Sequence, residues 1–301
     1  MKKFTEVYQE VFKESAQELN TIKNEDRYKY LIIISVIIVM LIIALRWQFK
    51  ILWIFIIPML IWLILSYTAH INNYKKIYKE KVIEKFIHAY SENLLYSPNR
   101  GIAPGLYNQA EFERYYDRYH SEDLITGNIF EDCKITMGEV HIEDKQTTTD
   151  SDGHTSTTYV TLFHGLFSQI ELSKYISFNL KIRKNSMLNN IFKSKSKLDM
   201  DSGSFEKIFD VNTDNKIQSM RILTSDVMQM LIDFKGKNKI VPEITIKDNK
   251  IFIRYETGNV FEPNFIKNDM DFDKLKKYYN IINFTLELSK QFAQNIMEFD
   301  E

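Results

Sequence analysis

The apolar residues of this chain are concentrated in two neighbouring runs near its N-terminus. Leu31 to Leu45 holds no charged residue and only one polar residue, Ser35, and Ile51 to Tyr67 is also uncharged. Each run is slightly shorter than the roughly 20 residues that cross a hydrocarbon layer about 30 Å thick, and flanking aromatic residues such as Tyr30 extend them to the interfaces. The pattern therefore predicts a transmembrane helical hairpin over residues 30–67.

Two other interpretations of these runs are disfavoured. A cleaved signal peptide would place its apolar run nearer the N-terminus, whereas here a charged segment precedes it and no small-residue cleavage site follows. A buried hairpin of a water-soluble protein would keep a polar helix face, and neither run has one. Since neither run contains an ionisable residue, we expect a membrane anchor and not a transporter.

Basic residues flank the hairpin unevenly. They precede the first run and follow the second as Lys23, Arg27, Lys29, Lys75, Lys76, Lys79 and Lys81, whereas the connection between the runs holds only Arg46 and Lys50. Positive charge stays on the cytoplasmic side of membranes. We therefore expect a multi-pass protein of the bacterial inner membrane with both termini in the cytoplasm.

Amphipathic helices are predicted on both sides of the hairpin, over residues 1–29 and 68–96. The first has an apolar face and an acidic stripe formed by Glu6, Glu10, Glu14 and Glu18, and the second repeats apolar residues every three or four positions among several lysines. We expect the two helices to pack together as a stalk, acidic against basic. The alternative is that the lysines only hold anionic lipid headgroups.

The pattern changes near Ser97, where a loop rich in Pro and Gly marks the start of a cytoplasmic domain over residues 97–301. A short helix is expected around 110–120. Strands follow, with a β-rich run from Tyr159 to Leu172 broken at Gly165 and a clean alternation from Ile176 to Ile182. The polar segment between Ile142 and Tyr159 contains Asp152-Gly153 and predicts the loop of a long β-hairpin.

The second half of this domain predicts a further set of strands and helices, so that it divides into two subunits, about 97–195 and 200–301. Phe205, Phe209 and Val211 indicate a strand, and Thr224 or Ser225 caps a helix. Ile244 and Ile246 are expected to pair with Ile251 and Ile253 in a tight hairpin, and an amphipathic helix from Phe272 to Ile296 closes the domain. The fold class is therefore α+β: a two-helix transmembrane hairpin with flanking amphipathic helices, and antiparallel β-hairpins packed with a few helices.

Composition narrows the function classes only slightly. With 39 basic and 40 acidic residues the net charge is -1, so nucleic acid is not an expected partner. Cys133 is the single cysteine, which excludes an intramolecular disulfide. The nine glycines form no phosphate-binding loop, and the six histidines do not fall into sequence motifs of metal ligands. We therefore predict no cofactor, no metal site and no catalytic residue.

Several stretches resemble a bacterial membrane family that carries the label domain of unknown function 3137. They are residues 118–127 (RYHSEDLITG), 163–167 (FHGLF), 205–211 (FEKIFDV), 221–224 (RILT) and the 248–253 stretch DNKIFI. The resemblance covers most of the chain, including the two spans. It implies no activity, because the family has none established, but it implies a membrane-associated protein partner.

The candidate interaction residues are His120, Asp123, His164 and Arg221. Acidic residues surround His120 as Glu111, Glu113, Asp117, Glu122 and Asp123, and such a cluster can bind a divalent ion or tune a general base. A solvated helix face with local ion pairs to Arg114 and Arg118 explains the cluster equally simply. His164 beside Gly165 either lines a pocket or is a core histidine, and Arg221 belongs to one of the stretches that carry the resemblance.

These observations together predict a membrane-anchored binding or scaffold module that engages a protein or a small ligand at the inner membrane. Its expected partners are the lipid bilayer, a membrane-associated protein and a second copy of the chain. One alternative is a membrane-tethered enzyme that uses the acidic cluster. Another is a ligand-triggered effector whose spans oligomerise and perturb the bilayer.

Overall fold

The chain forms two compact units, residues 1–90 with 262–271 and residues 91–261 with 272–301. A computed structural model describes residues 4–46, 53–130, 133–185, 196–263 and 272–298, without the side chains of residues 10, 12–14, 16–18, 20 and 22–28. The first unit is helical, and the second combines a β-sheet with helices. Strands on both sides of residue 195 belong to one sheet.

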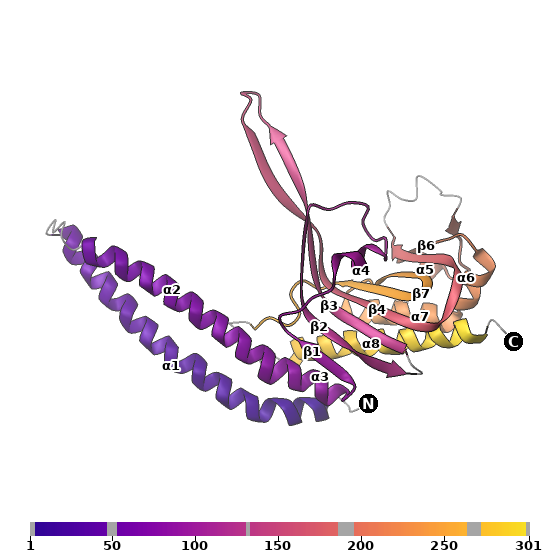
Figure 1. The fold of residues 1–301 in the computed structure, drawn as a ribbon, viewed down its shortest axis with the longest axis horizontal. Coiled ribbons are helices and arrows are strands. Elements are labelled where there is room, and N and C mark those ends of the chain that lie inside the picture. Colours follow the sequence, from indigo (N-terminus) through magenta and orange to yellow (C-terminus); the bar gives the residue numbers. More distant parts are fainter. Residues whose placement is uncertain (1–3, 47–52, 131–132, 186–195, 264–271, 299–301) are drawn as a thin grey trace. The chain divides into compact units, whose positions relative to one another are not determined.

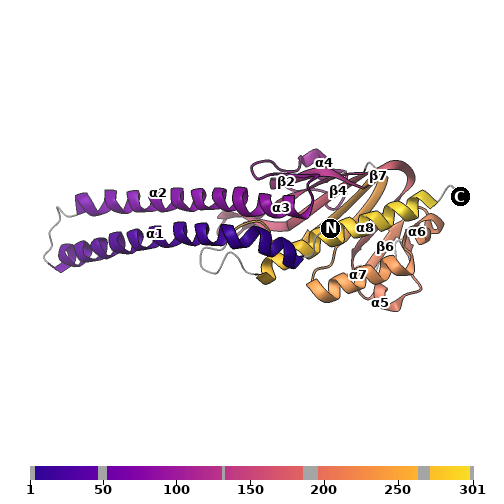
Figure 2. The ribbon, with the colours of Figure 1, turned by 90° about the horizontal axis from the view of Figure 1, so that it is seen from below.

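The helical unit is built from two long antiparallel segments that lie side by side (Figures 1 and 2). Helix α1 spans Phe4–Arg46, and α2 (Trp53–Tyr78) continues through a π-helical segment (Lys79–Ile83) into α3 (Glu84–Tyr90). The sequence predicted an N-terminal helix separate from the first span. The structure joins them, because no Pro or Gly between them interrupts the helix.

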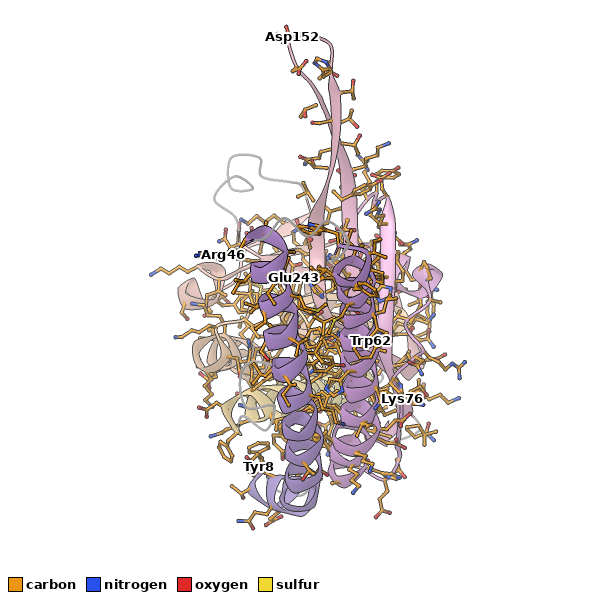
Figure 3. All side chains as sticks on the ribbon, turned by 90° about the vertical axis from the view of Figure 1, so that its left-hand side faces the viewer. Tyr8, Arg46, Trp62, Lys76, Asp152 and Glu243 are labelled. Carbon is orange, nitrogen blue, oxygen red and sulfur yellow. The ribbon has the colours of Figure 1, made fainter. Side chains whose placement is uncertain are left out.

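Both segments are long and apolar enough to cross a membrane. Their outward side chains are exposed over the apolar runs, as Ile32, Val39, Ile61 and Trp62 illustrate, with Trp62 labelled on α2 in Figure 3. The edge of the Tyr30 ring packs against Tyr67, with 5.2 Å between the centroids, and links α1 to α2. Large apolar surfaces of this kind are rare on soluble monomers and are typical of lipid or protein contact.

The helical parts that flank the two apolar runs pack together, which confirms this part of the predicted stalk. Val7 and Val11 on α1 are buried, and the hydroxyl of Ser15 donates a hydrogen bond of 3.4 Å to the carbonyl of Lys81. The side chains of Glu10, Glu14 and Glu18 lie outside the described residues, so the pairing of acidic and basic stripes stays a prediction.

Buried residues of the second segment recur every four positions, as Tyr74, Tyr78, Val82, Phe86 and Tyr90. An α-helix turns about 100° per residue, so four residues overshoot a full turn by about 40° and the stripe drifts round the helix. The π-helical segment lies in the middle of this series. Its hydrogen bonds join residues five apart, so it fits more residues into one turn and offsets the drift.

The second unit contains a seven-stranded antiparallel sheet in the order β1-β2-β3-β4-β6-β5, with β7 pairing to β4. Its strands are β1 (Leu94–Ser97), β2 (Arg118–Phe130), β3 (Cys133–Thr149), β4 (Thr155–Lys184), β5 (Lys197–Leu198), β6 (Phe209–Thr213) and β7 (Glu243–Glu256). The α+β class with an antiparallel sheet is therefore confirmed.

Strand β4 organises the sheet. Up to Glu171 it pairs with β3 on one edge, and from Leu180 it pairs with β6 there, while β7 lines the other edge. The expected break at Gly165 is wrong, because β4 continues through it. A Cβ at Gly165 would lie 2.0 Å from the carbonyl oxygen of Tyr255, so glycine here permits the close approach of β7.

Helices cover both faces of the sheet centre. Helix α8 crosses one face, where the hydroxyls of Tyr255 and Thr285 are 2.8 Å apart (Figure 2). On the other face Tyr107 of α4 packs against Phe167, with 5.0 Å between the ring centroids.

The helices of this unit are α4 (Pro104–Asn108), α5 (Gly203–Glu206), α6 (Lys216–Ile222), α7 (Ser225–Asn238) and α8 (Phe272–Met297). The hydroxyl of Thr224 accepts a hydrogen bond from the Val227 amide, which confirms the predicted cap of α7.

Beyond the other strands, β3 and β4 extend as a two-stranded ribbon, which we call the arm (residues 144–160). Figure 1 shows the arm projecting from the sheet, and Figure 3 labels Asp152 at its tip. The turn is fixed by Asp150, whose carboxylate accepts hydrogen bonds from the amides of Asp152 and His154 at 3.0 and 2.7 Å. The predicted hairpin is confirmed, although most of its polar segment is strand and not loop.

Two further expectations are wrong. No helix spans 110–120 in the described structure: α4 ends at Asn108, and strand β2 begins at Arg118. Phe205 lies in helix α5 and not in a strand, because Ser202 caps that helix by accepting a hydrogen bond from the Phe205 amide.

The tight hairpin expected around residues 247–250 is also wrong. Residues 243–256 form one strand, β7, in which Ile246 pairs with Leu180 and Ile251 with Ile170 of β4. Asp248 adopts a φ of 57° at the point where the register shifts. A local irregularity therefore takes up the polar residues that the sequence presents as a turn.

Candidate functional site

Three histidines lie in register on three neighbouring strands. His120 of β2 pairs directly with His141 of β3, and His141 pairs directly with His164 of β4. Residues directly opposite each other in an antiparallel sheet project to the same face, with Cβ atoms about 4.5–5.5 Å apart. We call these three residues the histidine row.

The side chains of the row are accessible to different degrees. The imidazole of His120 is 71% exposed, whereas His141 and His164 are half-buried. The rings of His141 and His164 stack with 4.4 Å between their centroids, and Nε2 of His141 lies 3.1 Å from Oγ1 of Thr161. Burial and the neighbouring His164 lower the pKa of His141, so its imidazole is neutral at physiological pH.

A group of acidic residues lies beside the row, because half-buried Glu122 and buried Glu139 pair two positions further along the same strands. Asp123 follows at an irregularity in β2, where its φ is 59°, and it is fully buried. The hydroxyl of Tyr96 donates a hydrogen bond to its Oδ1 atom. Burial and the Asp123 carboxylate raise the pKa of Tyr96, so this hydroxyl keeps its proton.

Glu139 links this group to the turn after β7. Its Oε1 atom accepts hydrogen bonds from the amides of Val260 and Phe261, the second at 3.1 Å. Burial has the largest effect on Glu139 and raises its pKa, the two amides lower the pKa, and the charge of Asp123 raises it. Together these effects bring the pKa of Glu139 to about 7. Glu139 can therefore gain or lose a proton near neutral pH without leaving the protein interior.

The structure separates the predicted candidates into different surroundings. His120 and His164 belong to one row, but only through His141, which the sequence did not single out. Asp123 lies on the same strand as His120 and is hydrogen-bonded to Tyr96. Arg221 is exposed in the last turn of α6, on another part of the unit.

The acidic residues around His120 have separate partners. Arg118, which the solvated interpretation expected to pair within the cluster, lies 3.7 Å from Glu143. Glu111 accepts hydrogen bonds of 2.5 Å from Lys181 and from Lys247, which lower its pKa to about 2. Asp117 accepts a hydrogen bond from the hydroxyl of Tyr115. Because these carboxylates lie on an irregular segment and on β2, the expected helix face does not exist.

A buried arginine holds Glu113, a contact that sequence reasoning missed. Arg254 forms ion pairs with Glu113 and with Glu243, the latter at 2.5 Å. Its guanidinium lies 4.4 Å from the centre of the Phe112 ring. Burial alone would lower the pKa of Arg254, but Glu243, Tyr107 and Glu113 outweigh it and raise the pKa. No sequence motif marks this network, because Glu113 lies in the segment before β2, far along the chain from Glu243 and Arg254 on β7.

Two hollows in the described part of this unit lie away from the row. A cavity of about 350 Å³ is lined by residues of β5, β6 and α5, among them Lys197, Glu206 and Asp210. An open groove of about 910 Å³ follows residues 108–116 beside Lys181. Neither of these two hollows is lined by His120 or Asp123.

Comparison with known proteins relates part of this chain to a domain of unknown function. The family model described as "Protein of unknown function (DUF3137)" matches residues 161–294, from β4 to α8. No curated protein matches the chain. A crystal structure of the mycobacterial trehalose monomycolate transport factor A, TtfA, aligns with 63% of this chain and 88% of its own at 8% identity and a TM-score of 0.30, and so weak a likeness carries no argument. Between β4 and α8 the chain therefore resembles a domain of unknown function.

Proposed function

We propose that the chain is a membrane-anchored binding module of the bacterial inner membrane. In this proposal the hairpin over residues 30–67 crosses the bilayer, both termini lie in the cytoplasm, and the α+β unit binds a membrane-associated protein there. The observation that carries the binding role is the arm, an exposed β-ribbon whose outer edges are covered by no other strand of the described structure.

Membrane anchoring is supported by the side chains of α1 and α2. Exposed apolar residues such as Ile32, Ile42, Ile61 and Leu65 would cost free energy in water, at about 25 cal/mol for each Å² of apolar surface, and cost none in lipid. The basic residues that flank the hairpin support the cytoplasmic orientation of both termini.

Protein binding is supported by the unpaired edges of the arm. Strand β2 pairs with β3 only as far as Glu143, and β7 pairs with β4 only from Gly165. Among the described residues, the ribbon between these limits pairs as strand only within itself, although at its base the Lys145 amide donates a hydrogen bond of 2.6 Å to the carboxylate of Asp117. Exposed strand edges bind extended segments of other proteins through backbone hydrogen bonds.

The composition of the arm fits this role. Threonines occupy paired positions on its two strands, including Thr147 opposite Thr157 and Thr149 opposite Thr155. Threonine favours extended backbone, so the strand conformation is kept in solvent. An isolated two-stranded ribbon is only marginally stable in water, and a bound third strand would stabilise it.

Site-specific photocrosslinking in membranes of the native host tests the proposal. A photoreactive amino acid replaces Thr147 or Thr157 on the arm, and the matched control replaces Ser204, which is exposed on α5. We expect one crosslinked protein at both arm positions and none at Ser204. Equal or absent crosslinking at all three positions would show that the arm is not the binding surface.

A further inference from the structure

The histidine row consists of three imidazoles, which are common metal ligands, and they lie side by side on one face of the sheet. We propose that His120, His141 and His164 bind one divalent transition-metal ion of the zinc type. The proposal rests on the strand register, which places three imidazoles side by side on one face, and it goes beyond the proposed binding of a protein.

Three imidazoles from three strands can reach one ion. Direct cross-strand pairs have Cβ atoms about 4.5–5.5 Å apart, so the two outer histidines are separated by about 10 Å with His141 between them. Zinc binds imidazole nitrogen at about 2.0–2.1 Å. An ion above His141 is therefore within reach of rings that lean inward from both sides.

The side chains have the freedom that this arrangement requires. The rings of His141 and His164 now stack at an interplanar angle of 27°, so they must turn their nitrogen edges toward a common point. The imidazole of His120 is mostly exposed and can swing toward His141 without displacing packed side chains. Thr161 can hold one ring nitrogen of His141 from outside, as the outer partners of metal-bound histidines do.

A fourth ligand is available from the same face. An Oε1 atom of Glu122 lies 4.0 Å from Nε2 of His120. Three imidazoles and a carboxylate or a water form a ligand set that suits zinc, whereas magnesium and calcium prefer oxygen alone. The ligand chemistry therefore favours zinc or a similar transition metal over these two ions.

Binding would affect the arm directly. His141 and His164 pair one position before Ile142 and Phe163, which are the last pair ahead of the register shift where the arm begins. An ion held by all three histidines would link β2, β3 and β4 at the base of the ribbon. It would therefore restrict the directions in which the arm can point.

Calorimetric titration of the full chain tests the site. The untagged protein in detergent micelles is stripped with a chelator and titrated with zinc chloride. We expect one zinc ion per chain, and at least tenfold weaker binding in each of the variants His120→Ala, His141→Ala and His164→Ala. His154→Ala is the matched control, because His154 lies in the arm turn beside Asp150, and it should bind zinc like the unchanged protein.

His120→Ala is the decisive variant, because its exposed imidazole contributes little to packing and the variant should fold normally. Circular dichroism of all variants shows whether the sheet is retained. Zinc affinity that is the same in the unchanged protein and in a triple variant lacking all three imidazoles would overturn the proposal, as would the absence of binding by the unchanged protein. Neither result would affect the crosslinking test of the arm.

Discussion

Glu262 is held by two lysines within the helical unit. Nζ of Lys75 lies 2.7 Å from one carboxylate oxygen, and Nζ of Lys79 lies 3.0 Å from the other. Burial alone would raise the pKa of Glu262, but hydrogen bonds from the two lysines outweigh it and lower the pKa. Lys79 is itself buried, so removal of this carboxylate would take away one of the charges that compensate its ammonium group.

We expect Glu262→Gln to lower the free energy of unfolding by about 1 to 2 kcal/mol at pH 7. The folded pKa is below the unfolded value of about 4.3, so the stabilisation is present above that pH and is lost as the pH falls through the folded pKa. Thermal unfolding of both proteins at pH 7 and at pH 4 measures the difference, which should shrink at pH 4.

Glu80→Gln is the control for this prediction. Glu80 is exposed and lies 3.9 Å from Lys76, so its loss should change the unfolding temperature very little. A difference between Glu262→Gln and the unchanged protein that is equal at both pH values would contradict the assignment to this carboxylate.

At the scale of elements, the stability of the sheet depends on how closely β7 approaches β4. At Gly165 the neighbouring backbone leaves no room for a Cβ, which would lie 2.0 Å from the Tyr255 carbonyl oxygen and 2.7 Å from the amide nitrogen of Thr257. Both neighbouring atoms belong to the backbone, so they cannot rotate away as a flexible side chain would.

We therefore expect Gly165→Ala to destabilise the α+β unit by about 1 to 3 kcal/mol, because β7 must move away from β4. Gly105→Ala is the control, since a Cβ at Gly105 in α4 meets no atom within 4 Å. Chemical denaturation followed by circular dichroism compares the two variants. Equal stability would show that the strands can separate at no cost.

The sequence predicts those elements whose signal is local. The four-residue repeat of Tyr74, Tyr78 and Val82 and the cap at Thr224 depend on neighbours in the chain, and both are confirmed. The prediction of a hairpin at 247–250 is wrong because the polar residues around Asp248 have the composition of a turn. Only the pairing of β7 with β4, whose partners run from Ile182 with Ile244 to Gly165 with Glu256, reveals one bent strand.

The candidate site is still less visible in the sequence. His120, His141 and His164 become neighbours through two strand registers, and each register depends on irregularities such as the one at Asp123. A shift of one residue would turn His141 to the opposite face. His120 and His164 can therefore be named as candidates from the sequence, but their connection through His141 cannot be predicted from it.

At the scale of the whole molecule, the proposed topology places the connection between α1 and α2 outside the cytoplasm and the arm inside. Arg46 ends α1, and Asp152 is exposed at the tip of the arm (Figure 3). Cys133 is buried and is the single native cysteine, so it can be replaced by Ser to give a background without thiols. Single cysteines then report the side of the membrane.

In spheroplasts, a membrane-impermeant maleimide should label Arg46→Cys but should label Asp152→Cys only after lysis, because a charged reagent does not cross the hydrocarbon layer. The thiol-free background is the control and should stay unlabelled. Labelling of Asp152→Cys in intact spheroplasts would contradict the cytoplasmic orientation.

The π-helical segment between α2 and α3 makes the effect of a deletion depend on where it falls. Removing one residue from Lys79–Ile83 would let ordinary α-helical bonds close the gap, and four α-helical residues turn through almost the same angle as five π-helical ones. Phe86 and Tyr90 would therefore keep their orientation and stay in the interior. A deletion in the regular helix before this segment would instead rotate every later residue by about 100° around the axis, so the same loss of one residue should be tolerated in the first place and harmful in the second.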